Sequence, residues 1–189
     1  MPRALSPERK ERFVALLLPH RNRLMAFARA MSGSEEDARD LFADTVAAAL
    51  QGFDRLRSDD AFLSWLLTIA SRLQKRRRYR GRLFERYDAE SDPDGRSARD
   101  DRPDEGPDIE LLYKALRRLP SQQSEAIILH EITGLPLEEV RAIQGGSLSA
   151  VKMRLHRGRR RLAELLGADD DQNPTDINEH DHGTATLHD

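Results

Sequence analysis

The chain contains no cysteine, and this absence excludes a disulfide framework and a zinc site held by thiolates. It also fits a reducing compartment, so we expect a cytoplasmic protein. No apolar run approaches the roughly 20 residues that a membrane-spanning helix needs, so we expect no membrane insertion. The first residues, MPRALSPERKERF, lack the apolar core of a secretory signal peptide, so we expect no leader.

Aromatic residues are also scarce, with six Phe, three Tyr and one Trp in 189 residues. No stretch alternates apolar and polar residues as a half-buried strand does, whereas apolar residues recur at spacings of three and four. This pattern predicts an all-α protein.

The net charge of −2 hides a strong segregation of charge along the chain. Residues 168–189 carry seven acids and no Lys or Arg, and residues 88–108 carry nine acids and three arginines. Without these two segments, the 33 acids and 31 bases of the chain become 17 acids and 28 bases. Basic helical bodies joined to acidic segments are typical of a protein that binds a polyanion.

The composition predicts two small helical domains. The first spans residues 6–87, and the second spans residues 108–167. Between them, residues 88–107 are rich in Pro, Gly and charge and nearly free of apolar side chains, which predicts a flexible acidic linker. For the same reason we expect residues 168–189 to form a disordered acidic tail.

The second domain contains a candidate helix-turn-helix between Leu119 and Leu166. Ser121 is expected to cap its first helix, and Gly134 to end it. Gly145-Gly146 breaks a short second helix, and Ser147 is placed to cap a long third one. A short helix, a glycine turn and a long helix form the layout of a helix-turn-helix.

The long third helix has an apolar face and a basic face. One face carries leucines and Val151 at spacings of three, four and seven, while the opposite face carries six bases within ten residues. Small or flexible side chains at the helix start would let the backbone approach base edges, and cations further along would meet phosphates. An ordinary solvated basic face is the alternative interpretation. Near bases we expect Ser149, Ala150, Met153, Arg154 and Arg157, and near phosphates Lys152, Arg159 and Arg160.

The first domain shows helix signals of the same kind. Ser6-Pro7 predicts a helix start, Pro19 a break, and Ser34 a second cap. A polar connector, FDRLRSDD, leads to a helix that Asp59 or Asp60 is expected to cap. From Arg72 to Arg86 that helix carries eight bases and one acid, with Tyr79 and Phe84 among them, which favours contact with unpaired bases and phosphates over a merely solubilising helix end.

The sequence shows no catalytic or metal constellation. His20, His130 and His156 are scattered, and the tail histidines His180, His182 and His188 have no helical or turn framework to fix ligand geometry. We therefore expect no metal, no cofactor and no enzymatic activity.

Both domains resemble those of bacterial sigma factors of the extracytoplasmic-function (ECF) group. For region four, the resembling residues are Leu119-Pro120, EAIILHEITGLPLEEV (125–140) and SLSAVKMRLHRGRRRL (147–162). For region two, they are DARDLFADTVAAAL (37–50) and FDRLRSDDAFLSWLLTIASRLQKRRR (53–78). The order and spacing of these motifs match the ECF layout over about residues 7–166.

The resemblance implies a sigma subunit that directs promoter-specific transcription initiation, in a stress or envelope response. It implies a second domain that binds the minus-thirty-five duplex and a first domain that holds the melted minus-ten strand. The implied minus-ten residues are Arg55, Arg57, Ser58, Asp60, Ser64, Thr68, Arg72, Lys75 and Arg76. The implied polymerase-facing residues are Asp40, Leu41, Asp44 and Thr45.

The implied partners are core RNA polymerase, through its clamp helices and flap, promoter DNA as duplex and melted strand, and an anti-sigma factor. Two other functions would use parts of the same sequence. A sigma-like decoy would bind an anti-sigma factor and never touch DNA, although it would not need the basic clusters. A stand-alone helix-turn-helix regulator would bind an operator without polymerase.

Overall fold

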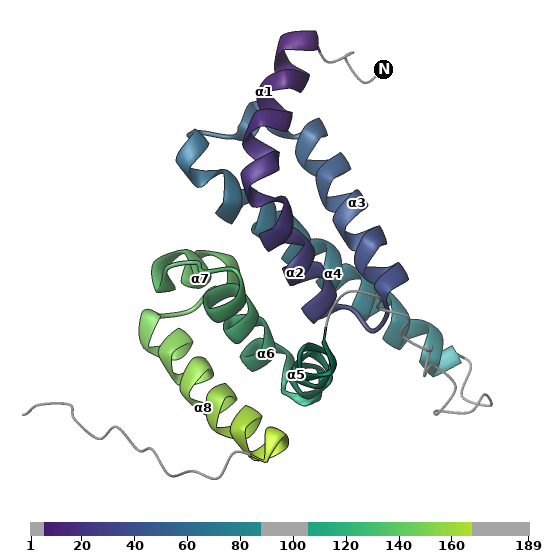
Figure 1. Cartoon of the computed structure of the whole chain (residues 1–189), viewed down its shortest axis with the longest axis vertical. Coiled ribbons are helices and arrows are strands. Elements are labelled where there is room, and N and C mark those ends of the chain that lie inside the picture. The colour runs from purple at the N-terminus through teal and green to yellow at the C-terminus, as the bar shows by residue number, and fades with distance from the viewer. Residues whose placement is uncertain (1–5, 88–105, 168–189) are drawn as a thin grey trace, which may run out of the picture.

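The computed structural model describes residues 6–87 and 106–167 (Figure 1). These residues form helices and turns with no strand, which confirms the all-α prediction. The α-helices are α1 (Pro7–Leu17), α2 (Arg21–Met31), α3 (Glu35–Gln51), α4 (Phe62–Tyr87), α5 (Pro107–Arg118), α6 (Ser121–Ile127), α7 (Leu137–Gln144) and α8 (Leu148–Leu166). Short 3-10 turns form η1 (Leu18–His20), η2 (Phe53–Arg55) and η3 (Asp59–Ala61), and a π-helical turn, η4 (Ile128–Ile132), extends α6. Most of the predicted linker and the predicted tail lie outside the described residues.

Serine side chains cap three of the helices as predicted. The hydroxyls of Ser6, Ser34 and Ser147 each accept a hydrogen bond from the backbone N–H three residues later, at 3.4, 3.1 and 3.1 Å. The predicted cap at Ser121 is wrong, because Pro120 occupies the capping position of α6, as Gly106 does that of α5. Each of these helices instead begins with the extended backbone that a residue before or at a proline adopts.

The first half of the molecule is built from α1 to α4. Pro19 breaks the first helical stretch as predicted, and the 3-10 turn η1 separates α1 from α2. Helix α2 packs against α3 and α4 around fully buried Leu24, Phe27, Leu41 and Leu66. Aromatic rings extend this core between α1 and η2, where Phe13 meets Phe53 edge to face with ring centroids 5.3 Å apart.

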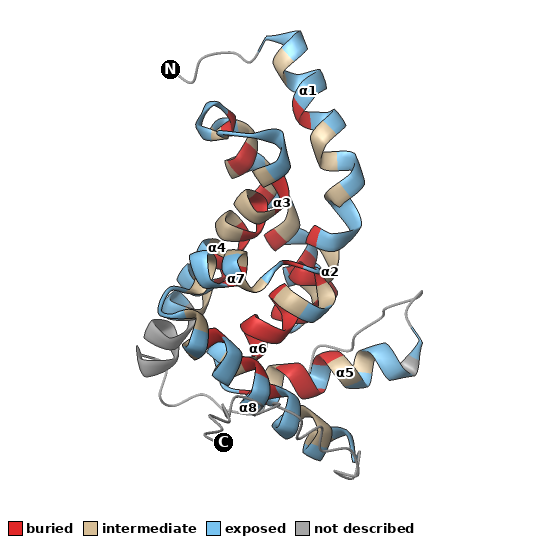
Figure 2. Cartoon of the chain, turned by 90° about the vertical axis from the view of Figure 1, so that its left-hand side faces the viewer, coloured by how far each residue is buried: buried red, intermediate tan, exposed pale blue. Residues whose placement is uncertain are grey.

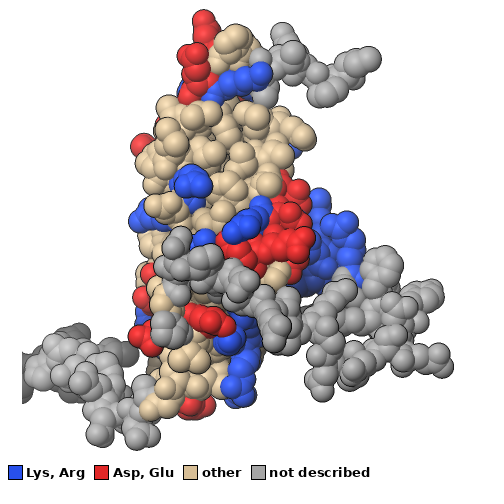
Figure 3. Space-filling view, turned by 45° about the vertical axis from the view of Figure 1, so that its right-hand side comes forward, with Lys and Arg blue, Asp and Glu red and all other residues tan. Residues whose placement is uncertain are grey.

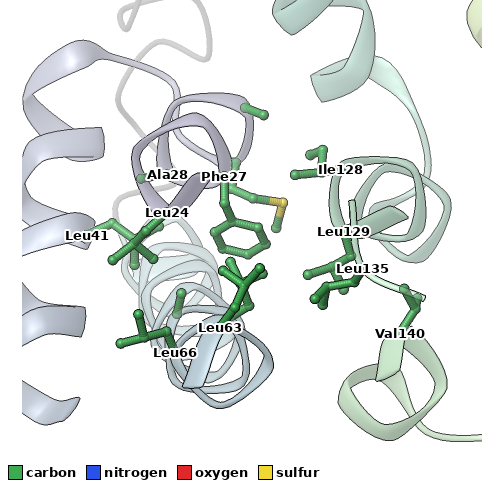
Figure 4. Close-up of a cluster of buried hydrophobic side chains, with 14 of the residues drawn as sticks. Leu24, Phe27, Ala28, Leu41, Leu63, Leu66, Ile128, Leu129, Leu135 and Val140 are labelled. Carbon is green, nitrogen blue, oxygen red and sulfur yellow. The ribbon is translucent and has the colours of Figure 1, made fainter. Parts of the chain in front are cut away.

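The second half, α5 to α8, packs directly against the first (Figures 1 and 2). Helix α2 contacts α5 and η4, and α4 contacts α7. The buried side chains of both halves form one continuous apolar cluster, in which Phe27 and Leu63 face Leu129 and Leu135 (Figure 4). Burial of apolar surface is thus the main force that holds the two halves together.

Candidate nucleic-acid interface

The turn between α7 and α8 positions the long basic helix. Gly145 and Gly146 have φ angles of +78° and +90°, which side chains with a Cβ rarely adopt. Ser147 follows in extended conformation and caps α8 through Ala150. The glycine pair and the cap therefore fix where α8 begins and which way it leaves the turn.

Packing against α6 fixes which face of α8 points outward. Val151 and Leu155 are buried, and Val140 of α7 is fully buried with them. Gly158 is also buried, and a Cβ at this position would lie 2.8 Å from Cδ1 of Ile127. A glycine inside a helical pattern often indicates that another element packs closely against the helix. The sequence alone does not show that this element is α6.

The outward face of α8 carries most of the residues predicted to contact duplex DNA. The exposed members are Ser149, Lys152, Met153, Arg157, Arg159 and Arg160. Ala150 is half-buried and lines a groove between the starts of α6 and α8, together with Met153 and Arg157. Small side chains at the helix start and cations along its length form a surface that fits a major groove.

Two of the predicted arginines make contacts within the second half of the molecule. Arg154 is half-buried and donates to the side-chain oxygen of Gln144 at 3.2 Å and to the backbone carbonyl of Gly145 at 3.1 Å. Arg159 forms an ion pair with Glu131. Arg154 therefore stabilises the turn that orients α8 in addition to its predicted place near bases.

The connector before α4 carries the first group of predicted minus-ten residues. Arg55, Arg57, Ser58 and Asp60 are all exposed there. Two arginines of α1 hold the connector at its ends, through ion pairs of Arg9 with Asp54 at 2.9 Å and of Arg12 with Asp59 at 2.6 Å. The guanidinium of Arg12 also lies 5.6 Å from the ring centroid of buried Phe53. The exposed residues thus project from a restrained loop.

The second group lies along α4. The hydroxyls of half-buried Ser64 and Thr68 donate to carbonyls of the preceding turn, those of Ala61 at 3.2 Å and of Ser64 at 2.7 Å. Arg72, Lys75 and Arg76 are exposed on the following turns. Tyr79, with 71% of its surface exposed, extends the same basic surface.

The four predicted polymerase-facing residues of α3 separate into two pairs. Asp40 and Asp44 are exposed, whereas Leu41 and Thr45 are fully buried, with the Thr45 hydroxyl donating to the Leu41 carbonyl at 2.6 Å. The expectation for Leu41 and Thr45 is therefore corrected, since this side of α3 packs into the core and cannot contact a partner. Figure 3 shows acidic side chains gathered beside basic ones where α3 adjoins α4. Asp44 of α3 and Arg77 of α4 form one such ion pair.

Sequence reasoning missed three polar residues at the boundary between the halves. Ser71, Glu125 and Gln144 are linked there by hydrogen bonds. Each stands in an amphipathic helix among ordinary polar neighbours, and no signal distinguishes it from a solvated residue.

Neither a metal-binding cluster nor a membrane-spanning helix occurs in the part of the chain that the structure describes. Residues 6–87 and 106–167 contain no group of three or more His, Asp or Glu side chains that could hold a metal ion. No helix in these ranges has the length and apolar character needed to cross a membrane.

Comparison with known proteins places both halves in one family. Residues 16–83 match the model of sigma-70 region 2, and residues 109–162 match that of sigma-70, region 4. The chain is 35% identical over 150 residues to the ECF RNA polymerase sigma factor EcfG of Rhodopseudomonas palustris, covering 77% of this chain and 80% of the relative. It is 30% identical over 160 residues to the RNA polymerase sigma factor CarQ of Myxococcus xanthus, covering 84% of this chain and 91% of the relative.

A solved structure extends the likeness to the fold. It is the sigma factor RpoE of Bartonella quintana in complex with the anti-sigma factor NepR, with a TM-score of 0.70 and 30% identity. The match covers 87% of this chain and 99% of that one, and so includes both halves of the molecule. The chain therefore belongs to the ECF group of sigma-70 factors, the RNA polymerase subunits that direct transcription initiation at specific promoters.

Proposed function

We propose that the two halves of this sigma factor divide the promoter between them. Residues 108–167 read the minus-thirty-five element as duplex, and residues 6–87 bind core polymerase and hold the melted minus-ten strand. The observation that carries the proposal is the glycine turn and serine cap that present the basic face of α8 outward.

For the minus-thirty-five element, α8 enters the major groove by its N-terminal end. Ser149, Ala150 and Met153 lie near base edges because their small or flexible side chains allow close approach. Lys152, Arg159 and Arg160 reach phosphates from the exposed side of the helix, while exposed Arg157 lies with the residues near base edges. Arg154 contacts DNA while its guanidinium also holds the turn before α8 through the carbonyl of Gly145.

For the minus-ten element, the restrained loop and α4 receive the strand after its bases unstack. Unstacking costs a few kcal/mol per step. Contacts from Arg57 and Ser58 of the loop and from Arg72 and Arg76 of α4 offset this cost. The protein itself performs no bond chemistry in this mechanism, so we infer that it is not an enzyme on its own.

Core polymerase is the first partner, and we infer that the clamp helices dock on the exposed side of α3. Asp40 and Asp44 supply the carboxylates for this contact. The flap of the polymerase contacts residues 108–167. The protein acts in the cytoplasm, where promoter DNA and polymerase meet. An anti-sigma factor is a further proposed partner, supported by the likeness to a sigma factor solved with one.

Run-off transcription on fragmented genomic DNA tests the proposal. We expect transcripts only when the protein and core polymerase are both present, from start sites that share two spaced sequence blocks. The variant Arg157→Glu should lose promoter-specific transcripts and retain core binding, because it reverses the charge of an exposed groove residue. Lys10→Glu, an exposed residue of α1, makes the same charge change away from the proposed DNA surface. Unchanged transcription by Arg157→Glu would contradict the groove assignment.

A further inference from the structure

The carboxylate of Glu125 is buried at the boundary between the two halves of the molecule. Glu125 lies in α6 and is 2% exposed. The Ser71 hydroxyl of α4 donates to its Oε1, and the Lys75 ammonium of α4 lies 3.3 Å from its Oε2. Gln144 of α7 donates to the same Oε2 at 3.0 Å. A buried carboxylate is costly without such partners, so two residues of α4 stabilise Glu125 in this position.

The partners on α4 form a recognisable pair. Ser71 and Lys75 are four residues apart, so their side chains lie on one face of the helix, one turn from each other. Serine hydroxyls and lysine ammonium groups are common ligands of phosphate oxygens. The carboxylate of Glu125 has the charge and the acceptor oxygens of the group that such a pair binds.

We propose that Ser71 and Lys75 form a binding site for a backbone phosphate of single-stranded DNA, and that Glu125 occupies this site while the two halves are packed together. The proposal deepens the minus-ten assignment and rests on it. Ser71 becomes a DNA ligand that the sequence did not suggest, and its neighbour Lys75 was already expected at the melted strand.

Competition for the same donors follows from this assignment. The strand and Glu125 cannot both occupy Ser71 and Lys75, so strand binding requires α6 to move away from α4. The apolar contacts between Phe27 and Leu129 would be lost in the same movement. Free protein should thus bind single strands weakly, and weakening the Glu125 contacts should strengthen that binding.

Two variants separate the competitor from the site. Glu125→Gln keeps the shape of the side chain but places a neutral amide against two donors, Lys75 and Gln144, so the packed arrangement should weaken. Ser71→Ala removes one of the contacts to Glu125 and also one ligand of the proposed site. Glu110→Gln is the matched control, since Glu110 pairs with Lys114 within α5 and the same charge is lost.

The test uses the full chain and two readouts. Because the chain lacks cysteine, Gln51→Cys and Leu166→Cys, exposed on α3 and α8, allow dye labelling for energy transfer between the halves. Fluorescence anisotropy of a labelled oligothymidine at low salt then measures binding to single-stranded phosphate independently of promoter sequence.

We expect Glu125→Gln to lower energy transfer and to bind oligothymidine on the order of tenfold more tightly, the effect of one charged hydrogen bond. Ser71→Ala should also lower energy transfer, yet the double variant should bind several-fold more weakly than Glu125→Gln alone. Glu110→Gln should match the wild type in both readouts.

Three results would overturn the proposal. Unchanged energy transfer in Glu125→Gln would show that its contacts do not hold the halves together. Equal gains in affinity for Glu110→Gln and Glu125→Gln would assign the effect to net charge. Equal affinity of the double variant and Glu125→Gln would remove Ser71 from the site. None of these results depends on promoter-specific transcription, so a failure of the proposed function would be seen separately in the run-off assay.

Discussion

Asp44 of α3 and Arg77 of α4 form an ion pair, with Oδ2 of Asp44 2.6 Å from a terminal guanidinium nitrogen of Arg77. The pair joins the proposed polymerase-docking surface to the basic helix proposed for the minus-ten strand. Arg77 also donates to the backbone carbonyl of Asp37 at 3.2 Å, so it spans about two turns of α3. The proposed docking surface on α3 and the helix proposed for the minus-ten strand are therefore in direct contact.

This relationship predicts different effects for its two members. Asp44→Ala should weaken binding to core polymerase on the order of tenfold, because one charged contact is lost. Arg77→Ala should leave core binding near the wild-type value, since Asp44 remains and its carboxylate is released. Surface plasmon resonance with immobilised core polymerase measures both. Equal losses in the two variants would mean that the pair acts by orienting α3 and that Asp44 does not contact polymerase.

Local sequence signals predicted the ends of the helices well where a single side chain decides the outcome. The caps at Ser6, Ser34 and Ser147 and the break at Pro19 depend on hydrogen bonds within one helical turn. The cap at Ser121 was wrong because the preceding proline already had the extended backbone of a capping residue. Residue type alone does not decide which of two adjacent residues, here Pro120 or Ser121, takes the capping position.

The packing of the two halves could not be predicted from the pattern. Phe27 and Leu129 each fit the apolar stripe of their own helix, and a stripe does not reveal which surface covers it. Glu125 is an acid in a helix, which ordinarily indicates a solvated position. Its burial depends on Ser71 and Lys75, which are about fifty residues away in the sequence.

Gly158 should be intolerant of even a methyl group. In Gly158→Ala, the new Cβ would lie 2.8 Å from Cδ1 of Ile127 and 3.3 Å from Cβ of Gln123, so the Ile127 side chain must rotate or α6 and α8 must move apart. Overpacking costs about 1–3 kcal/mol, and we expect this cost to exceed the roughly 1 kcal/mol gained in helix propensity. Urea unfolding should show a lower midpoint. Ile127→Val, which removes Cδ1, should recover part of the loss in the double variant, and a midpoint above that of the wild type would contradict this packing.

His20 should make stability depend on pH. Its ring stacks on Phe62 with centroids 6.1 Å apart, and burial, followed by the charge of Arg23, lowers the pKa of His20. The folded state therefore favours the neutral ring, while the unfolded chain takes up a proton below about pH 6.5. Protonation then favours unfolding, so the free energy of unfolding should fall as the pH drops from 7.5 through 6.5 towards the folded-state pKa.

The variant His20→Phe isolates this effect, because it retains a ring against Phe62 and cannot be protonated. Urea midpoints at pH 7.5 and 5.5 should differ less in His20→Phe than in the wild type, with carboxylate titration common to both. An equal difference in the two proteins would show that other groups cause the pH dependence.

Neighbouring residues on α8 should separate phosphate contact from base contact. Lys152 and Met153 are both exposed near the start of the helix, and only Lys152 is charged. Lys152→Ala should reduce the slope of log affinity against log salt by about 0.9, since one fewer counterion is released from duplex DNA. Met153→Ala should leave the slope unchanged and reduce the preference for promoter over mixed-sequence duplex. Anisotropy titrations at several salt concentrations measure both quantities. An unchanged slope in Lys152→Ala would show that Lys152 neutralises no phosphate, and an unchanged preference in Met153→Ala would remove Met153 from the base edges.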